Sequence, residues 1–401
     1  MVYQPSKEIL EKYADVLVNF ALNSGKGIKK GEKVFIQVPE CAKPLLIVLR
    51  RAVLKAGGFP LIQYIPDDFS REFFELANDE QLDFFPQSLL KGRVEEMDHL
   101  ISIIADKDMK ELEGIQGEKI MRNQKAFKPY FEWRDEKENQ GKFTWTLALY
   151  GTEAMAKEAG MSLEEYWTEI IRACFLDLDN PKEKWQSIFV ELERIKNELN
   201  KLEIEKIHVK SENIDLTIGI GKNRKWMGGS GRNIPSFELF ISPDCRIADG
   251  KIKFTEPLYR YGNLINGVSL EFKNGEIVKA EAVEGEEILK SMIETDPGSK
   301  RIGEFSLTDK RMSRIMRFMA ETLFDENVGG EYGNCHIAIG KAYQDSYPGD
   351  VTKITKDQWK EMGYNDSAVH TDIVTREDRV ATAFLVNGEN KVIYQNGKFV
   401  V

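Results

Sequence analysis

The sequence predicts an N-terminal α/β domain with a parallel-type sheet, followed by a β-rich α+β domain. Strand-like and helix-like segments alternate in the first half of the chain. Period-two hydrophobic patterns dominate from about residue 204. The 401 residues also exceed what one core usually organises. We place the boundary at residue 200, giving domains of residues 1–200 and 201–401.

The first half begins with a βαβ pattern. A β-rich run at residues 33–38 precedes a helix-period segment at about 42–56, which Gly57 and Gly58 end, and a further apolar run follows at 60–65. A helix between two consecutive strands of this kind implies that the strands are parallel. Because the pattern has no dinucleotide-binding glycine fingerprint, it argues against NAD as a cofactor.

Two later helices have clear start signals. Ser162 and Glu165 form a capping box, and Asn180 before Pro181 caps the next helix. That next helix carries apolar residues at steps of three and four: Trp185, Ile188, Phe189, Leu192, Ile195, Leu199 and Leu202. We expect this stripe to be buried and the helix to close the first domain.

Strands are predicted throughout most of the second half. Apolar residues alternate with polar ones over 207–220, and Asn-Gly pairs at 266–267, 274–275, 387–388 and 396–397 predict hairpin turns. One helix is expected near residues 313–322, where four apolar residues recur at helical spacing: Met312, Ile315, Met316 and Met319. The glycine-rich segment 219–233 matches no phosphate-loop pattern, so we interpret it as a β connection that leads into the Glu238 segment. A wall of the active site is the alternative interpretation.

Composition excludes several classes of protein. The chain has 56 Lys and Arg against 66 Asp and Glu, so its net charge of −10 has the wrong sign for a nucleic-acid partner. Charges interrupt any signal-peptide core near the N-terminus, and no stretch approaches the roughly 20 apolar residues of a membrane span. We therefore expect a soluble, cytoplasmic protein with no membrane partner. The four scattered cysteines predict free thiols.

Two of the four histidines lie in patterns that suit chemistry. In AVHTDIV, His370 and Asp372 are two residues apart, so on a strand they project from one face. His336 follows two acidic candidates, Glu326 and Glu331, across a glycine-containing segment. An isolated His-x-Asp is more often a hydrogen-bonded structural pair, and the His336 region equally fits a polar connection.

Two glutamates lie among apolar neighbours. Glu238 occurs in PSFELFIS and Glu304 in RIGEFSL. A buried carboxylate is costly unless it is paired or bound to a metal. Simple alternation on exposed strands, with both glutamates facing water, explains the same patterns, so neither selects a metal site alone.

Five motifs in order resemble the aminopeptidase T and aminopeptidase S family of dinuclear metallo-aminopeptidases. They are GRNIPSFELFISPD (231–244), RIGEF (301–305), LFDEN (323–327), NCHIAIGKAY (334–343) and VHTD (369–372). The segments LVNFALNSGKGIKKGEKVFIQ and TEAMAKEAGMSLEEYW are also similar, so the resemblance covers essentially the whole chain. It implies a peptide substrate, removal of N-terminal residues, and a homodimer.

The resemblance also implies six metal ligands in the β-rich domain, and a catalytic or supporting hydroxyl from Tyr343. The six ligands are Glu238, Glu304, Glu326, His336, His370 and Asp372. The motif selects Glu326 as a ligand, and we also expect Glu326 to act in catalysis. The proton is passed to the leaving amine either by a bridging carboxylate or by one that binds no metal, for which Glu331 is a candidate. Because VGGEYGN separates the DEN motif from His336, Glu331 competes by its spacing five residues before the histidine.

Charge arithmetic agrees with a dinuclear site. Four carboxylates balance two divalent cations, and oxygen and imidazole donors without thiolate suit Zn²⁺, Co²⁺, Mn²⁺ or Mg²⁺ without choosing among them. Two ions about 3.5–4 Å apart would activate a bridging water and polarise the scissile carbonyl. We expect Tyr343 to donate a hydrogen bond to the developing oxyanion.

Two rival functions stay open at this point. The first is a ring-cleaving dioxygenase with a single iron on a similar scaffold, for which a His, His, Asp set would be suitable. Retention of Glu238, Glu304 and Glu326 argues against it. The second is a non-catalytic protein that binds peptide or metal with the same ligands.

Overall fold

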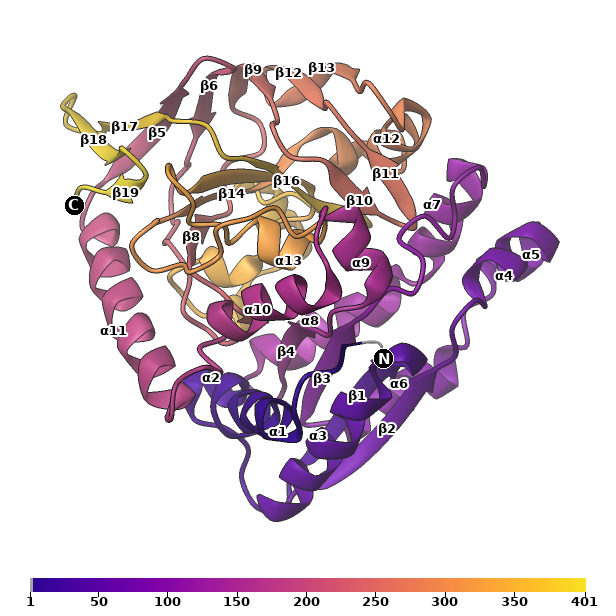
Figure 1. The fold of residues 1–401 in the computed structure, drawn as a ribbon. Helices are drawn as coiled ribbons and strands as arrows, with labels where there is room; N and C mark the ends of the chain where they lie inside the picture. The colour runs from indigo at the N-terminus through magenta and orange to yellow at the C-terminus, as the bar shows by residue number, and fades with distance from the viewer. Residues whose placement is uncertain (1–2) are drawn as a thin grey trace.

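A five-stranded sheet lies at the centre of the N-terminal half of the computed structural model, which describes residues 3–401 (Figure 1). Its order is β2-β1-β3-β4-β7, and neighbouring strands are parallel. The strands are β1 (Lys33–Pro39), β2 (Phe59–Ile65), β3 (His99–Ile104), β4 (Thr144–Leu149) and β7 (Asn233–Ile234). Helix α3 (Lys43–Lys55) connects β1 to β2, which confirms the predicted βαβ unit and parallel sheet.

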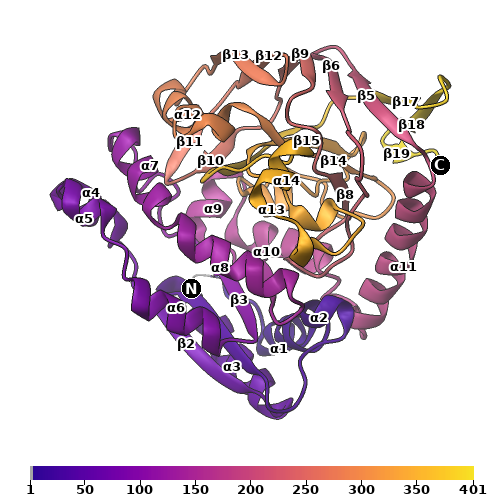
Figure 2. The same ribbon diagram turned by 180° about the vertical axis from the view of Figure 1, so that it is seen from behind.

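Helices cover both faces of this sheet because successive residues of a strand point in opposite directions. In β1, Val34 and Ile36 belong to the large apolar core, whereas Phe35 belongs to a second, smaller cluster. Helices α6 (Gln87–Glu96) and α8 (Lys128–Asn139) lie side by side over the smaller cluster (Figure 2). The other helices of this half are α1 (Lys7–Val16), α2 (Leu22–Gly25), α4 (Ser70–Leu76), α5 (Asp79–Asp83), α7 (Gly117–Ala126), α9 (Glu153–Glu158), α10 (Leu163–Ala173) and α11 (Pro181–Asn200).

The predicted caps and the buried stripe are confirmed. Ser162 and Glu165 form the capping box of α10, and the Asn180 side chain accepts a hydrogen bond from the backbone of Glu183 at the start of α11. Five residues of the α11 stripe are buried and the remaining two are partly buried against the core: Trp185, Ile188, Leu192, Ile195 and Leu199, then Phe189 and Leu202.

The predicted boundary at residue 200 falls between α11 and β5, which begins at Ile204. Strand β7 nevertheless returns from the second half to pair with β4, and the large apolar core contains residues of both halves. The division into domains of residues 1–200 and 201–401 stays a prediction.

The C-terminal half is built on antiparallel sheets, as predicted. The largest has the order β13-β12-β9-β6-β5-β17-β18-β19. Its strands are β5 (Ile204–Lys210), β6 (Ile214–Gly219), β9 (Ala248–Lys253), β12 (Ser269–Lys273), β13 (Glu276–Glu281), β17 (Val380–Leu385), β18 (Asn390–Gln395) and β19 (Lys398–Phe399). A two-stranded ribbon, β10 (Leu258–Arg260) with β11 (Asn263–Ile265), and helices α12 (Glu286–Ile293) and α14 (Lys356–Glu361) accompany it.

Three of the four predicted hairpin turns are confirmed. The Asn-Gly pairs at 274–275, 387–388 and 396–397 join strands that pair with each other. The prediction at 266–267 is wrong, because β11 and β12 on either side of it are not partners. Strand β12 pairs instead with β9 and β13, so the tertiary arrangement overrides the local turn signal.

The helix expected at residues 313–322 is also wrong, since only α13 (Thr322–Asp325) is helical in this region. Long-range hydrogen bonds replace the helical ones. The Asp325 carboxylate accepts from the backbone N–H groups of Met319 and Glu321, and the carbonyl of Ile315 accepts from Gly329. Within residues 3–401, no helix is long and apolar enough to cross a membrane.

Candidate metal centre

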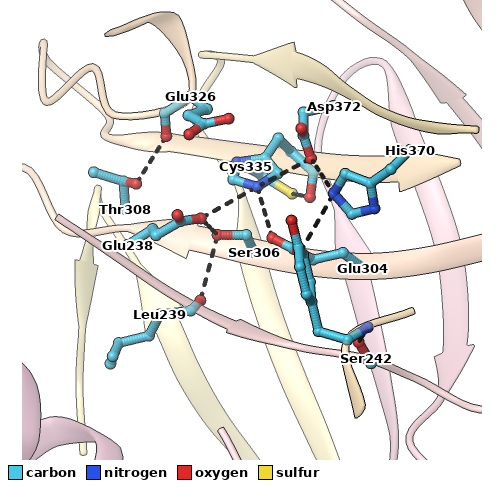
Figure 3. A network of polar contacts seen from close by, with 12 residues as sticks. Glu238, Leu239, Ser242, Glu304, Ser306, Thr308, Glu326, Cys335, His370 and Asp372 are labelled. Carbon is cyan, nitrogen blue, oxygen red and sulfur yellow. Dashed lines mark hydrogen bonds and ion pairs between the residues drawn. The ribbon is translucent and has the colours of Figure 1, made fainter. Parts of the chain in front are cut away.

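A four-stranded antiparallel sheet, ordered β16-β15-β14-β8, positions most of the predicted ligands. Its strands are β8 (Glu238–Ile241), β14 (Ile302–Thr308), β15 (Asn334–Gly340) and β16 (His370–Thr375). Each strand contributes at least one: Glu238 on β8, Glu304 on β14, His336 on β15, and His370 with Asp372 on β16. Figure 3 shows the side chains of four of them, Glu238, Glu304, His370 and Asp372, gathered together.

His336 lies at the centre of this group. Its Nε2 atom is 3.2 Å from Glu238 Oε2, 3.2 Å from Glu304 Oε1 and 3.8 Å from Asp372 Oδ1. The Nε2 atom of His370 lies 3.8 Å from Glu304 Oε2 and 3.6 Å from Asp372 Oδ1. Residues that are more than 130 positions apart in sequence therefore present donor atoms to a common space.

Glu326 joins this group from outside the sheet. It is buried at the C-terminal end of α13, and one of its oxygens lies within 4.8 Å of donor atoms of His336 and Asp372. Glu331 is exposed, and its backbone carbonyl accepts a hydrogen bond from the Lys310 ammonium. The structure thus brings Glu326 to the other five residues and leaves Glu331 outside.

Hydrogen bonds orient several of these side chains. The Nδ1 atom of His370 is 2.8 Å from the carbonyl oxygen of Lys341; a carbonyl only accepts, so Nδ1 carries the proton and Nε2 presents its lone pair to the group. The Ser306 hydroxyl donates to Glu238 Oε2 at 2.8 Å. Such outer contacts are typical of metal ligands.

The shifted pKa values of the candidate ligands indicate an excess of buried negative charge. Burial, together with the neighbouring Glu304 carboxylate, raises the pKa of Glu238 to about 7 despite the opposing effect of His336. Burial and the Glu238 carboxylate likewise raise the pKa of Glu326. Burial disfavours the charged form of His336, but its carboxylate neighbours raise its pKa to about 9.

This donor set fits divalent cations. Four carboxylates face only two imidazoles, and Asp372 Oδ1 and His336 Nδ1 are buried atoms without a hydrogen-bond partner among the described residues. Three overlapping groups each bring donor atoms within 4.8 Å of one another: Glu238, Glu304 and His336; Glu304, His370 and Asp372; Glu326, His336 and Asp372. Cations placed among them would offset the like charges.

Tyr343 lies just beyond β15 and lines the same cavity, which has a volume of about 50 Å³. Its ring is 4.9 Å from the His370 ring and inclined by 66°. Burial and the charges of Glu304 and Asp372 raise the pKa of the Tyr343 hydroxyl well above its usual value. The hydroxyl therefore stays protonated and is able to donate a hydrogen bond at neutral pH.

The alternative prediction that segment 219–233 forms a wall of the active site agrees with Arg232 and Asn233, which line this cavity, whereas the sequence analysis missed Trp145. Trp145 on β4 and Asn233 on β7 come from the parallel sheet, and Arg232 lies between them. The Arg232 guanidinium is 3.0 Å from Glu138 and 2.6 Å from Asp345, and 5.8 Å from the rings of Trp145 and Tyr343. The glycine-rich segment 219–233 and the GRNIPSFELFISPD motif were the sequence signals for Arg232 and Asn233, and none indicated Trp145.

Four carboxylates and two imidazoles that converge beside one cavity are a donor set for divalent metal ions and define a metal-dependent protein. The chain belongs to the thermophilic metalloprotease family (M29), whose sequence model matches residues 6–399. This confirms the predicted family and enzyme class: the protein is a metallopeptidase, and its family implies a divalent metal cofactor.

Named relatives align along nearly their full length. The chain is 28% identical to aminopeptidase PepS of Streptococcus thermophilus, covering all of both chains, and 27% identical to aminopeptidase T of Thermus thermophilus, covering 98% of this chain and 99% of the relative. It is 28% identical to aminopeptidase AmpS of Bacillus subtilis, covering 97% and 98%. The solved structure of wild-type AmpT from Thermus thermophilus superposes with a TM-score of 0.83 at 25% identity, covering 98% of this chain and all of that one.

Proposed function

We propose that this metallopeptidase removes N-terminal residues from peptides and uses two divalent metal ions to do so. The observation that carries the proposal is the convergence of six candidate ligands, Glu238, Glu304, Glu326, His336, His370 and Asp372, beside one cavity. The names of the aligned relatives support the choice of an aminopeptidase.

Two ions rather than one are supported by the number and charge of the donors. Each of the three donor groups is large enough for one ion, and His336, Glu304 and Asp372 each belong to two of the groups. A single divalent ion would leave two of the four buried carboxylate charges uncompensated. Zn²⁺, Co²⁺, Mn²⁺ and Mg²⁺ all accept this donor chemistry.

The chain's own residues prepare the reaction. Bound divalent ions would supply Lewis acidity and lower the pKa of a water molecule to near neutrality. The protonated Tyr343 hydroxyl is suited to donate a hydrogen bond to the oxygen of the scissile carbonyl as negative charge develops there. We assign to Glu326 the role of taking the proton from the water and passing it to the leaving amine, because burial raises its pKa and so makes its ionised carboxylate a stronger base.

The test combines metal analysis with peptidase assays. We expect about two ions per chain by elemental analysis, and release of p-nitroaniline from leucine or arginine p-nitroanilide after addition of Co²⁺ or Zn²⁺. His370→Ala is expected to abolish turnover. The matched control is His208→Ala, because His208 also pairs with an aspartate, Asp215 at 2.9 Å, but does so on β5, outside the cavity.

Full activity in chelator-treated protein would contradict this proposal. A single iron with no activity on amino-acyl anilides would indicate the dioxygenase instead, which the family match does not favour. Bound metal with no turnover of any peptide would indicate a binding protein.

We also propose that the enzyme is a homodimer. Helices α4 and α5 project from the body of the molecule (Figures 1 and 2), and large apolar side chains in and beside them are exposed: Phe69, Leu76, Phe84 and Leu89. Exposed apolar groups that cluster on a projecting segment are typical of protein contacts. Sedimentation equilibrium tests this, and a species of 46.0 kDa at micromolar concentration would contradict it.

A further inference from the structure

Asn233 lies where the parallel sheet meets the metal centre. It is paired with Leu147 of β4, and the N–H of Leu147 donates to the carbonyl of Arg232 at 2.7 Å. On the other side of this segment, Glu238 begins β8 and carries a candidate ligand. Asn233 also lines the cavity. Its backbone is therefore held by regular structure, which is the best support for a precisely placed side chain.

The hydrogen bond to Glu326 fixes the orientation of the Asn233 amide. The Asn233 Nδ2 atom lies 3.1 Å from Glu326 Oε1. As a metal ligand Glu326 is ionised and only accepts hydrogen bonds, so the NH₂ end of the amide must face it. The reversed amide would place two oxygens against each other. The carbonyl end of Asn233 is thus directed away from Glu326.

This carbonyl oxygen has no partner. Asn233 Oδ1 is buried, and no donor among residues 3–401 reaches it. A buried amide oxygen without a hydrogen bond is costly, and at the wall of a cavity a water molecule or a bound ligand supplies the missing donor. The nearby guanidinium of Arg232 does not supply one, because Glu138 and Asp345 engage it.

The chemistry of the missing partner follows from the reaction. A peptide cut at its first bond brings one group that an internal bond lacks, its free α-amine. That amine retains N–H donors whether it is protonated or shares its lone pair with a cation. The carboxylates around the cavity are candidate metal ligands. Among the described side chains that line the cavity, Asn233 Oδ1 is the neutral acceptor that is buried and has no hydrogen-bond partner.

We propose that Asn233 binds the α-amine of the substrate through its side-chain carbonyl oxygen, while its NH₂ group holds Glu326. The residue would then help to restrict cleavage to the first peptide bond. This inference rests on the aminopeptidase activity proposed above, and it assigns a substrate contact to a residue outside the candidate ligand set.

Binding of the product and of its deaminated analogue to the metal-loaded enzyme tests this role. Leucine and 4-methylpentanoate differ only in the amine, and isothermal titration calorimetry gives the ratio of their affinities. In Asn233→Ala the affinity for leucine relative to that for 4-methylpentanoate is expected to fall about 10- to 100-fold. This factor corresponds to the free energy of one hydrogen bond to a charged group. The KM for leucine p-nitroanilide should rise by a similar factor when excess metal ion keeps the variant loaded, because loss of the amide that holds Glu326 also weakens metal binding.

Two further variants separate binding from support of Glu326. Asn233→Asp keeps an acceptor oxygen and should keep most of the preference for leucine. The matched control is Asn334→Ala, because Asn334 is also buried, donates to a carbonyl at 2.9 Å and has an unpartnered Oδ1, but does not line the cavity. The affinity of Asn334→Ala for leucine relative to 4-methylpentanoate should equal that of the wild type. Asn233→Ser replaces Asn233→Ala if circular dichroism shows that the latter does not fold.

An unchanged affinity ratio in folded Asn233→Ala would overturn the proposal. Loss of metal from Asn233→Ala with an unchanged affinity ratio of leucine to 4-methylpentanoate would also overturn it, because Asn233 would then act only by positioning Glu326. Failure of the proposed function gives a different result, namely metal-loaded wild-type enzyme that releases no p-nitroaniline.

Discussion

Replacing Glu326 by glutamine tests whether this carboxylate is a metal ligand. Glu326 is 5% exposed and shares its donor group with only His336 and Asp372. Loss of Glu326 leaves only two protein donors for an ion bound in this group, fewer than the three that a catalytic zinc ion normally has. We therefore expect the metal content of Glu326→Gln to fall by about one ion per chain, because loss of even an outer partner weakens metal binding about 10- to 100-fold.

Glu331→Gln is the matched control for this experiment. It makes the same chemical change five residues from His336, but at an exposed position outside the donor groups. Elemental analysis after dialysis against metal-free buffer, with turnover of leucine p-nitroanilide, measures both variants. Full metal content and activity in Glu326→Gln, or loss of an ion in Glu331→Gln, would refute the assignment of Glu326.

Three further predictions concern stability. Trp185→Ala removes a fully buried ring whose centroid is 5.2 Å from that of Phe237, next to Glu238, and should lower the free energy of unfolding in urea by about 3–5 kcal/mol; a change within experimental error would contradict this packing. Burial and nearby Glu111 and Asp108 raise the pKa of Asp106 to about 6, above its value in the unfolded chain. Ionisation of this carboxyl therefore lowers the free energy of unfolding as the pH rises from about 4 to 6, and the loss persists at higher pH. Asp106→Asn should then stabilise the protein at pH 8 by about 3 kcal/mol and have little effect near pH 3, and equal effects at both pH values would argue against it. Chelation should lower the thermal midpoint, and Zn²⁺ or Co²⁺ at about 100 times its dissociation constant should restore about 2.7 kcal/mol; a midpoint that is independent of metal would speak against a bound cofactor.

Local signals in the sequence predicted local structure well. The capping box at Ser162 and the stripe that begins at Trp185 are confirmed because their hydrogen bonds and apolar contacts involve residues within a few helical turns. The alternation over AVHTDIV correctly placed His370 and Asp372 on one strand.

Signals that compete with distant contacts misled the prediction. The stripe from Met312 to Met319 has helical spacing, but the Asp325 carboxylate and the loop at 329–330 take the backbone hydrogen bonds that a helix would need. Met316 is accordingly 51% exposed rather than part of a buried face. The Asn-Gly pair at 266–267 has the right turn chemistry, but its flanking strands pair elsewhere.

The sequence by itself determined the parallel and antiparallel halves, the family and the residue types of the candidate metal centre. Periodicity, capping and motif order depend on neighbouring residues, which a sequence displays directly. Only the tertiary structure decided that Glu326 rather than Glu331 faces His336, and that Asn233 and Arg232 return to the first sheet to wall the cavity. Those outcomes depend on strand pairing and burial between segments far apart in the chain, and no local pattern encodes them.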